Sequence, residues 1–261
     1  MEKLIYASAK TLANAIRHRE VSSEEVVKTY LERIEEVNPT LNAVVQITAD
    51  MALAQARAAD KRLHRGEIFG PLHGVPMTIK DSIETAGVIC TGGTKGRENF
   101  IPKQDAPVVA RLRSAGAILL GKTNLPELSL AYETDNLIYG RTNNPYDLSR
   151  TPGGSSGGEA AIIAVGGSPF GLGADMAGSI RIPAHFCGIA GIKPTTNLVP
   201  RTGHFPPLGG ILSSLWQIGP MARFVEDLIL VLPIIAGVDW CDPGIVPMPW
   251  SDPQMVNLKN L

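Results

Sequence analysis

Long apolar segments are absent from this sequence of 261 residues. The longest apolar run, 228–238, is interrupted by Pro233 and predicts a buried helix, whereas a membrane span needs about 20 consecutive apolar residues. The first residues, Met1–Tyr6, lack the apolar run of a signal peptide. We therefore expect no membrane span and a cytoplasmic location.

Cysteine and histidine are also scarce. The three cysteines, Cys90, Cys187 and Cys241, are odd in number and far apart, which predicts reduced thiols rather than a disulfide framework or a zinc site. The five histidines form no H-E-x-x-H pattern or similar cluster. The sequence therefore predicts neither a metal site nor a cofactor.

An excess of charge of either sign is missing too, because 24 Lys and Arg side chains face 25 Asp and Glu side chains. A net charge of −1 gives no long-range attraction for nucleic acid or for an anionic membrane. We expect a small-molecule substrate as the partner and no direct contact with nucleic acid. The hydrophobic fraction of 44% is enough for a packed core, and no linker divides the chain, so we expect one domain over residues 1–261.

Local patterns predict helices that alternate with short apolar strands. Ser22 and Glu25 form a capping-box pattern ahead of an amphipathic helix, and Asp105 is expected to cap a helix that has Pro107 in its first turn. One expected helix begins at 22, and the others cover 48–66, 105–116, 157–165, 179–186 and 225–235. The expected strands cover 75–79, 117–120, 170–174 and 189–192. This alternation predicts an α/β fold whose sheet is covered by helices on both faces.

Two glycine-rich segments each contain a serine that could carry chemistry. One is 151–159, with Ser155, and the other is 171–181, with Ser179. A serine hydroxyl needs a base within hydrogen-bond reach to act as a nucleophile, and neither segment contains a histidine. Lys80 offers another base, because it ends an apolar strand and burial lowers the pKa of a lysine.

These residues predict a proton relay. A neutral Lys80 takes a proton from Ser155, which takes one from Ser179. The turn before Ser179 offers backbone N–H groups to the oxyanion, and the expected donors are those of Met176, Ala177, Gly178 and Ser179. A glycine–serine loop alone is most often a turn and a lysine at a strand end is most often solvated, so the prediction rests on the combination.

The whole pattern identifies a family. Lys80 closes the motif G-V-P-M-T-I-K and precedes Ser155 by 75 residues, and Ser155 precedes Ser179 by 24 residues. Motif residues fill the segments 74–81, 121–124, 142–146, 153–158, 173–183, 186–188 and 191–195. In residue types, order and spacing, the chain closely resembles the amidase signature family from about Leu4 to about Asp242.

The resemblance implies an amidase that hydrolyses the C–N bond of a carboxamide to an acid and an amine or ammonia. It implies a mixed β-sheet, an acyl-enzyme on Ser179, and Lys80 as the base. Ser155 would be the relay, placed after a cis peptide bond from Gly154. Apolar residues also hint at an apolar acyl group, namely Leu130, Ile138, Phe205, Pro206, Pro207 and Leu208.

Two departures from the family pattern matter. Where the family usually has two glycines before the nucleophile, this chain has Ala177 and Gly178, so we expect a slightly reshaped oxyanion hole. Family members normally continue with further strands and helices, whereas this sequence stops at Leu261. We expect the fold to be incomplete at its C-terminal end, and the chain alone to form a homo-oligomer, to aggregate or to be weakly active.

Three other interpretations compete with this one. Residues 116–123 fit the phosphate-loop pattern of a nucleotide-binding module, although the four residues between its glycines read as a strand. Gly153-x-Ser155-x-Gly157 fits the nucleophile elbow of α/β-hydrolases, but His204 precedes its candidate partners Asp227 and Asp239, against the order of that triad. The third is an inactive, truncated amidase-like protein that keeps the fold for binding.

Overall fold

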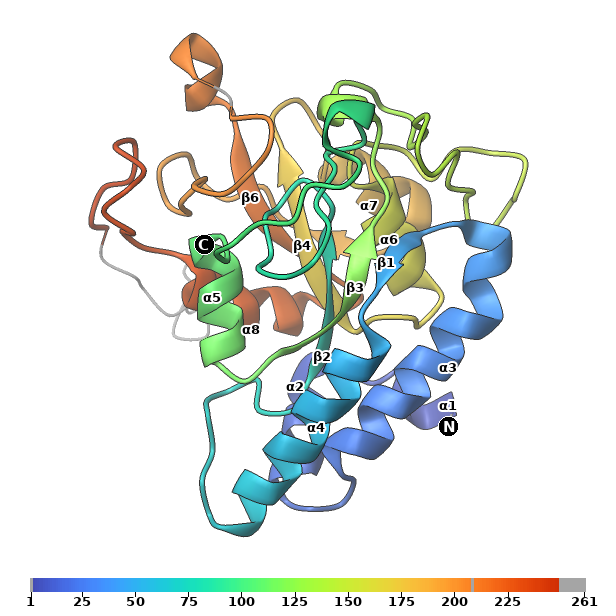
Figure 1. Ribbon diagram of the computed structural model, residues 1–261, viewed down its shortest axis with the longest axis vertical. Coiled ribbons are helices and arrows are strands. Elements are labelled where there is room, and N and C mark those ends of the chain that lie inside the picture. Colours follow the sequence, from blue (N-terminus) through green and yellow to red (C-terminus); the bar gives the residue numbers. More distant parts are fainter. Residues whose placement is uncertain (1, 208, 249–261) are drawn as a thin grey trace, which may run out of the picture.

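A computed structural model describes residues 2–207 and 209–248, and a mixed six-stranded sheet forms its centre (Figure 1). The strand order is β1-β3-β2-β4-β6-β5. The strands are β1 (Val44–Ile47), β2 (Pro76–Lys80), β3 (Ile118–Thr123), β4 (Phe170–Asp175), β5 (Ala190–Gly191) and β6 (Gln217–Ala222).

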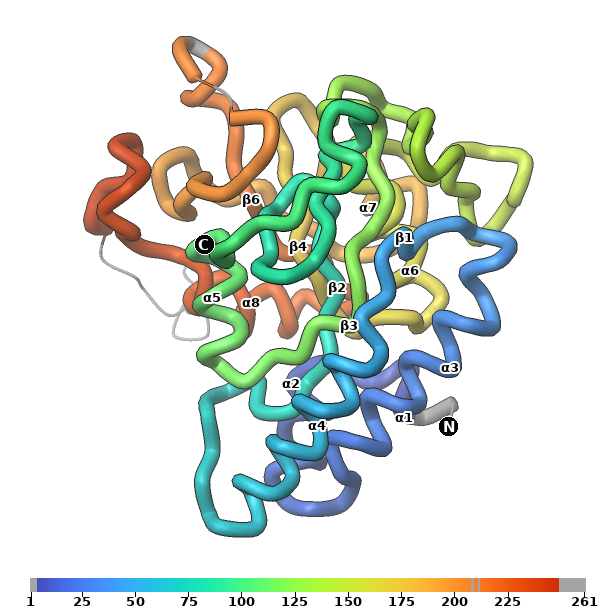
Figure 2. Tube along the Cα trace, in the orientation of Figure 1, coloured from blue at the N-terminus to red at the C-terminus, as the bar shows by residue number. Residues whose placement is uncertain are grey.

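The three central strands run in the same direction. β2 pairs in parallel with β3 and with β4, whereas β1 pairs antiparallel with β3, and β6 pairs antiparallel with β4 and β5. The parallel strands therefore end at the same edge of the sheet, where the long connection 124–156 and the described residues between β5 and β6 lie (Figure 2). Lys80 and Asp175, the last residues of β2 and β4, meet at this edge.

Helices cover both faces of the sheet, as the sequence predicts. In Figure 1, α4 and α5 lie in front of the sheet and α6 and α7 behind it, and α6 contacts β1, β2, β4 and β6. The helices are α1 (Glu2–Ile5), α2 (Ala9–Arg17), α3 (Ser23–Leu41), α4 (Ala49–His64), α5 (Pro107–Ser114), α6 (Gly157–Ala164), α7 (Arg181–Cys187) and α8 (Val225–Ile235). Among the described residues, no helix is both long and apolar enough to cross a membrane.

Of the two predicted helix caps, the one at Ser22 is confirmed and the one at Asp105 is wrong. Ser22 accepts from the Glu25 N–H, and the Glu25 side chain accepts from the Ser22 N–H, so the predicted capping box is present. The α5 cap is Ala106 rather than Asp105. The Asp105 carboxylate accepts instead from the Ala86 N–H and from Arg113, since an ion pair within reach competes with the helix end.

Two strands, β1 and β6, are not predicted from the sequence, and several helices begin later than predicted. β1 is only four residues long, and β6 contains Gly219 and Pro220, two residue types that argue against a strand. Pro220 has no N–H to donate to the sheet, and its carbonyl accepts from the Ile192 N–H. α7 begins at Arg181 rather than at Ser179, which leaves Ser179 on the turn between β4 and the helix.

Candidate active site

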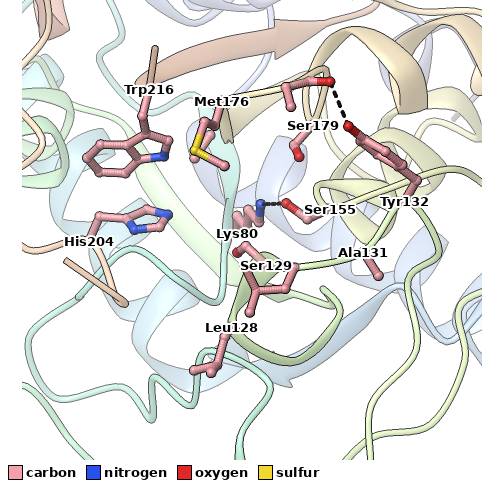
Figure 3. Close-up of a pocket in the computed structure, with 13 residues that line it drawn as sticks. Lys80, Leu128, Ser129, Ala131, Tyr132, Ser155, Met176, Ser179, His204 and Trp216 are labelled. Atoms are coloured by element: carbon pink, nitrogen blue, oxygen red, sulfur yellow. Dashed lines mark hydrogen bonds between the residues drawn. The ribbon is translucent and has the colours of Figure 1, made fainter. Parts of the chain in front are cut away.

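Lys80 and Ser155 form a direct hydrogen bond at the carboxyl edge of the sheet. Lys80 has no exposed surface, and its Nζ donates to Ser155 Oγ over 2.5 Å (Figure 3). The Gly154–Ser155 peptide bond is cis. A Cβ at position 154 would lie 2.9 Å from the Ala131 carbonyl oxygen, so glycine is required there to bring this loop against 131–133. The residues predicted as base and relay are thus brought together by two elements far apart in the sequence.

Burial governs the charge state of Lys80. Desolvation lowers the pKa of its ammonium from 10.5 to about 7, against the opposing pull of the negative charges of Asp175 and Glu159. A lysine with this pKa is neutral in a large fraction of molecules near neutral pH, so it can accept a proton. The depressed pKa and the contact with Ser155 are the two properties that a lysine base needs.

Glu159 is a second buried ionisable group beside this lysine. Its carboxylate accepts from the hydroxyls of Thr78 on β2 and of Thr123 on β3, the latter over 2.7 Å. Burial raises its pKa to about 7, against these hydrogen bonds and the charges of Lys122 and Lys80. Glu159 therefore ties α6 to β2 and β3, and its negative charge favours the protonated form of Lys80.

Ser179 lies near Ser155, in the cavity that Lys80 also lines. It follows β4 on a turn, it is 8% exposed, and it lines the same cavity as Lys80 and Ser155. Its backbone carbonyl accepts from the Ser156 N–H over 3.1 Å, which fixes one glycine-rich segment against the other. Within the described part of the chain, the Ser179 hydroxyl has no hydrogen-bond partner, and in Figure 3 it lies near Ser155.

Asp175 shapes the turn that carries Ser179. Its carboxylate accepts from the Gly178 N–H over 2.8 Å, from the Ile180 N–H over 3.1 Å and from the Arg181 guanidinium over 2.9 Å. Although burial acts to raise the pKa of Asp175, these donors outweigh it and hold that pKa below its usual range. The carboxylate therefore stays charged and keeps the turn in one conformation.

The four expected oxyanion donors do not all remain free. The Gly178 N–H donates to the Asp175 carboxylate in this structure, so its role as an oxyanion donor stays a prediction. The N–H groups of Met176, Ala177 and Ser179 make no hydrogen bond to another described residue. Gly178 has φ +122°, whereas Ala177 is not among the residues with positive φ, so the alanine needs no strained backbone.

The cavity over these residues has a volume of about 160 Å³ and mostly apolar walls. Leu130 lines it as expected, but Ile138, Phe205, Pro206 and Pro207 do not, and Leu208 lies outside the described residues. The other lining residues are Lys80, Leu128, Ser129, Ala131, Tyr132, Ser155, Ala174, Met176, Ala177, Ser179, His204 and Trp216.

The phosphate-loop interpretation is wrong. Residues 118–123 form β3 in the middle of the sheet, and the Lys122 side chain has no exposed surface. Its Nζ donates to the Ile83 carbonyl and to Thr85 Oγ1, and Thr123 is bonded to Glu159. Neither polar side chain is free to meet a phosphate.

The nucleophile-elbow interpretation also fails. His204 lines the cavity, but Asp227 accepts from the Ala9 N–H over 3.0 Å, and Asp239 accepts from the Asp242 N–H over 2.9 Å. No described aspartate therefore bonds to His204. Burial also lowers the pKa of His204 to about 3, which makes it a poor base.

Comparison with known proteins agrees with this geometry. A family model described as Amidase matches residues 25–260. The chain belongs to the amidase signature family. It is 49% identical over 250 residues to a Glutamyl-tRNA(Gln) amidotransferase subunit of Carboxydothermus hydrogenoformans, covering 96% of this chain and 51% of the relative. It is 48% identical over 241 residues to the protein of the same name from Caldanaerobacter subterraneus subsp. tengcongensis, with 92% and 48% covered.

Solved structures of the amidase signature family share this fold. The peptide amidase of Stenotrophomonas maltophilia has a TM-score of 0.87 at 37% identity, over 94% of this chain and 50% of that one. A fatty acid amide hydrolase has the same TM-score at 31% identity, over 96% of this chain and 45% of that one. The chain thus spans about half the length of the relatives it matches.

Some residues of this amidase signature site cannot be found from the motifs alone. Glu159 and Asp175 lie in or beside the motif segments, yet their roles depend on contacts with Thr78, Thr123 and Arg181. His204 and Trp216 belong to none of the family motifs and reach the cavity only through the fold. The sequence signal for Glu159 is its place four residues after Ser155, which puts both near the start of α6.

Proposed function

We propose that this protein hydrolyses the C–N bond of a carboxamide, with Ser179 as nucleophile, Ser155 as proton relay and Lys80 as base. The observation that carries the proposal is the 2.5 Å hydrogen bond between a lysine of depressed pKa and Ser155, in the cavity that also holds the free hydroxyl of Ser179. We further propose that residues 1–261 act as one domain.

The reaction follows from this geometry in two halves. Ser179 Oγ attacks the carbonyl carbon while its proton passes to Ser155 Oγ, and the Ser155 proton passes to Lys80 Nζ. The oxyanion accepts hydrogen bonds from the free N–H groups of the turn, at Met176, Ala177 and Ser179. When the C–N bond breaks, the relay runs backwards and protonates the leaving nitrogen, which leaves an ester on Ser179.

Water completes the cycle. It attacks the ester carbonyl and gives its proton to the same relay, and the Ser179 oxygen then leaves and takes a proton back from Ser155. The products are a carboxylic acid and an amine or ammonia. The three side chains end the cycle in the protonation states in which they began it, so the relay needs no cofactor.

A fluorophosphonate probe tests this proposal directly, because the probe forms a stable adduct only with an activated serine. Wild type is expected to gain one adduct, located on Ser179 by peptide mass spectrometry, and Ser179→Ala is expected to gain none. Ser149→Ala is the matched control, since Ser149 is exposed and its hydroxyl bonds only to Asp147. Equal labelling of wild type and Ser179→Ala would sink the assignment, and no labelling of either would favour an inactive amidase-like protein.

A second candidate function comes from the relatives. Proteins named as a Glutamyl-tRNA(Gln) amidotransferase subunit match nearly the whole chain at 45–49% identity. If this chain has the activity that the relatives' name describes, its substrate is the side-chain amide of glutamine, and the released ammonia passes to a further subunit. Release of ammonia from glutamine, compared with turnover of a simple aryl amide, separates the two substrate classes.

A further inference from the structure

The His204 ring forms one wall of the active-site cavity. In Figure 3 it lies under Trp216, across Lys80 and Ser155 from Tyr132. The ring meets the Trp216 indole edge-on, with 4.4 Å between ring centroids and 67° between planes. His204 is thus a polar group in the cavity wall, at a place that the proton relay does not use.

Hydrogen bonding determines the tautomer of this ring. His204 Nδ1 lies 3.2 Å from the Pro206 carbonyl oxygen, and a carbonyl oxygen can only accept, so Nδ1 carries the proton. Burial and the positive charge of Lys80 both lower the pKa of the ring, which stays neutral at ordinary pH. Nε2 therefore presents a lone pair. It is buried and has no partner among the described residues.

The backbone holds the ring in this place. The Phe205 N–H donates to the Ser82 carbonyl over 2.7 Å, and the Glu84 N–H donates to the Gly203 carbonyl over 2.7 Å. His204 itself pairs with Ile83 in an isolated bridge. Because these contacts attach the loop to the segment just after Lys80, the position of Nε2 relative to the relay is set before any ligand binds.

We infer that His204 Nε2 accepts a hydrogen bond from a hydroxyl or amine group carried by the amide substrate. A buried acceptor without a partner is costly, and a ligand donor that reaches it removes that cost. The remaining walls are mostly apolar, and the volume of 160 Å³ is close to the cavity of about 150 Å³ that holds benzene in a model system. The substrate class is therefore an amide with a ring-sized group bearing a donor. This inference rests on the proposed amidase function.

Matched pairs of amides test the inference, because a hydroxyl and a methyl group have similar size but only the hydroxyl donates. One arm places the group on the acyl side, with the three hydroxybenzamides against the three toluamides. The other arm places it on the amine side, with N-(hydroxyphenyl)acetamides against N-tolylacetamides. We expect wild type to favour a hydroxyl compound about tenfold in kcat/KM in one arm, the worth of one net hydrogen bond.

Variants assign that preference to the ring. His204→Phe keeps a ring against Trp216 but lacks the acceptor, so we expect the hydroxyl-to-methyl ratio of kcat/KM to fall to about one, whatever happens to the absolute turnover. His204→Gln supplies an amide oxygen and is expected to keep part of the preference. Labelling by the fluorophosphonate probe shows that each variant is folded. Equal discrimination by wild type and His204→Phe, or none by wild type in either arm, overturns the inference.

Binding separates this inference from the proposed function. In Ser179→Ala, which cannot turn over, calorimetry should give the same tenfold preference in Kd, and the double variant with His204→Phe should lose it. If wild type hydrolyses no amide but the Kd preference is present, the proposed function fails and the inference survives. If hydrolysis is intact and the Kd values are equal, the inference alone fails.

Discussion

Replacing Lys80 by methionine is expected to stabilise the folded protein while it abolishes turnover. Burial lowers the pKa of this lysine from 10.5 to about 7, although Asp175 and Glu159 pull it upward. A difference of this size corresponds to about 5 kcal/mol of stability lost at pH 7, which an uncharged side chain of similar length would regain. Part of that gain is offset when Ser155 loses its donor, so we expect a net gain of about 1–4 kcal/mol in the free energy of unfolding.

The gain has a defined pH dependence. Below the folded pKa of about 7, the lysine is charged in both the folded and the unfolded states, so the penalty of burying its charge is at its full value. Between about 7 and 10.5 the folded form is neutral, and the penalty falls by about 1.4 kcal/mol per pH unit. The advantage of Lys80→Met should therefore shrink steadily from pH 7 towards pH 10.

Urea unfolding of wild type and Lys80→Met at pH 7, 8 and 9 measures this effect. Lys122→Met is the matched control, because Lys122 is equally buried but donates to the Ile83 carbonyl and opposes the buried charge of Asp81. That substitution removes a donor to the Ile83 carbonyl and the positive charge that faces Asp81, so it should destabilise. A Lys80→Met protein that is less stable than wild type at pH 7, or whose advantage is the same at pH 7 and pH 9, would refute the burial penalty.

Three further predictions concern activity. Turnover of an aryl amide should rise with pH through about 7, as Lys80 loses its proton; a flat profile between pH 6 and 8 would contradict a lysine base. Glu159→Gln should move the midpoint of that rise to lower pH, because it removes a negative charge that favours the protonated lysine; an unmoved midpoint would show that Glu159 is not charged there. Asp175→Asn should lower kcat/KM about a hundredfold, because an amide has one acceptor oxygen where the carboxylate uses two, so it cannot hold the N–H groups of both Gly178 and Ile180 and displaces the oxyanion donors; unchanged kinetics, with Asp147→Asn as the control, would exclude that role.

Local sequence patterns were sufficient for the elements with strong local causes. The capping box of Ser22 and Glu25 and the apolar runs of β2, β3 and β4 are present where their patterns predict them. The spacing of Lys80, Ser155 and Ser179 was enough to indicate the family, because motif residues recur in order along most of the chain. These features depend on near neighbours in the chain or on a pattern of residue types that can be recognised without knowing contacts.

The tertiary structure decided which groups meet and which charges they carry. The depressed pKa of Lys80 requires the complete burial that only the packed fold provides, and the hydrogen bond of the Gly178 N–H requires the Asp175 carboxylate to turn back onto the loop that follows it. The cap assigned to Asp105 failed because Arg113 and the Ala86 N–H compete for the same carboxylate. His204 faces the cavity only because its loop pairs with residues that follow β2. Contacts between residues distant in the chain set desolvation and hydrogen bonding, and no local pattern records them.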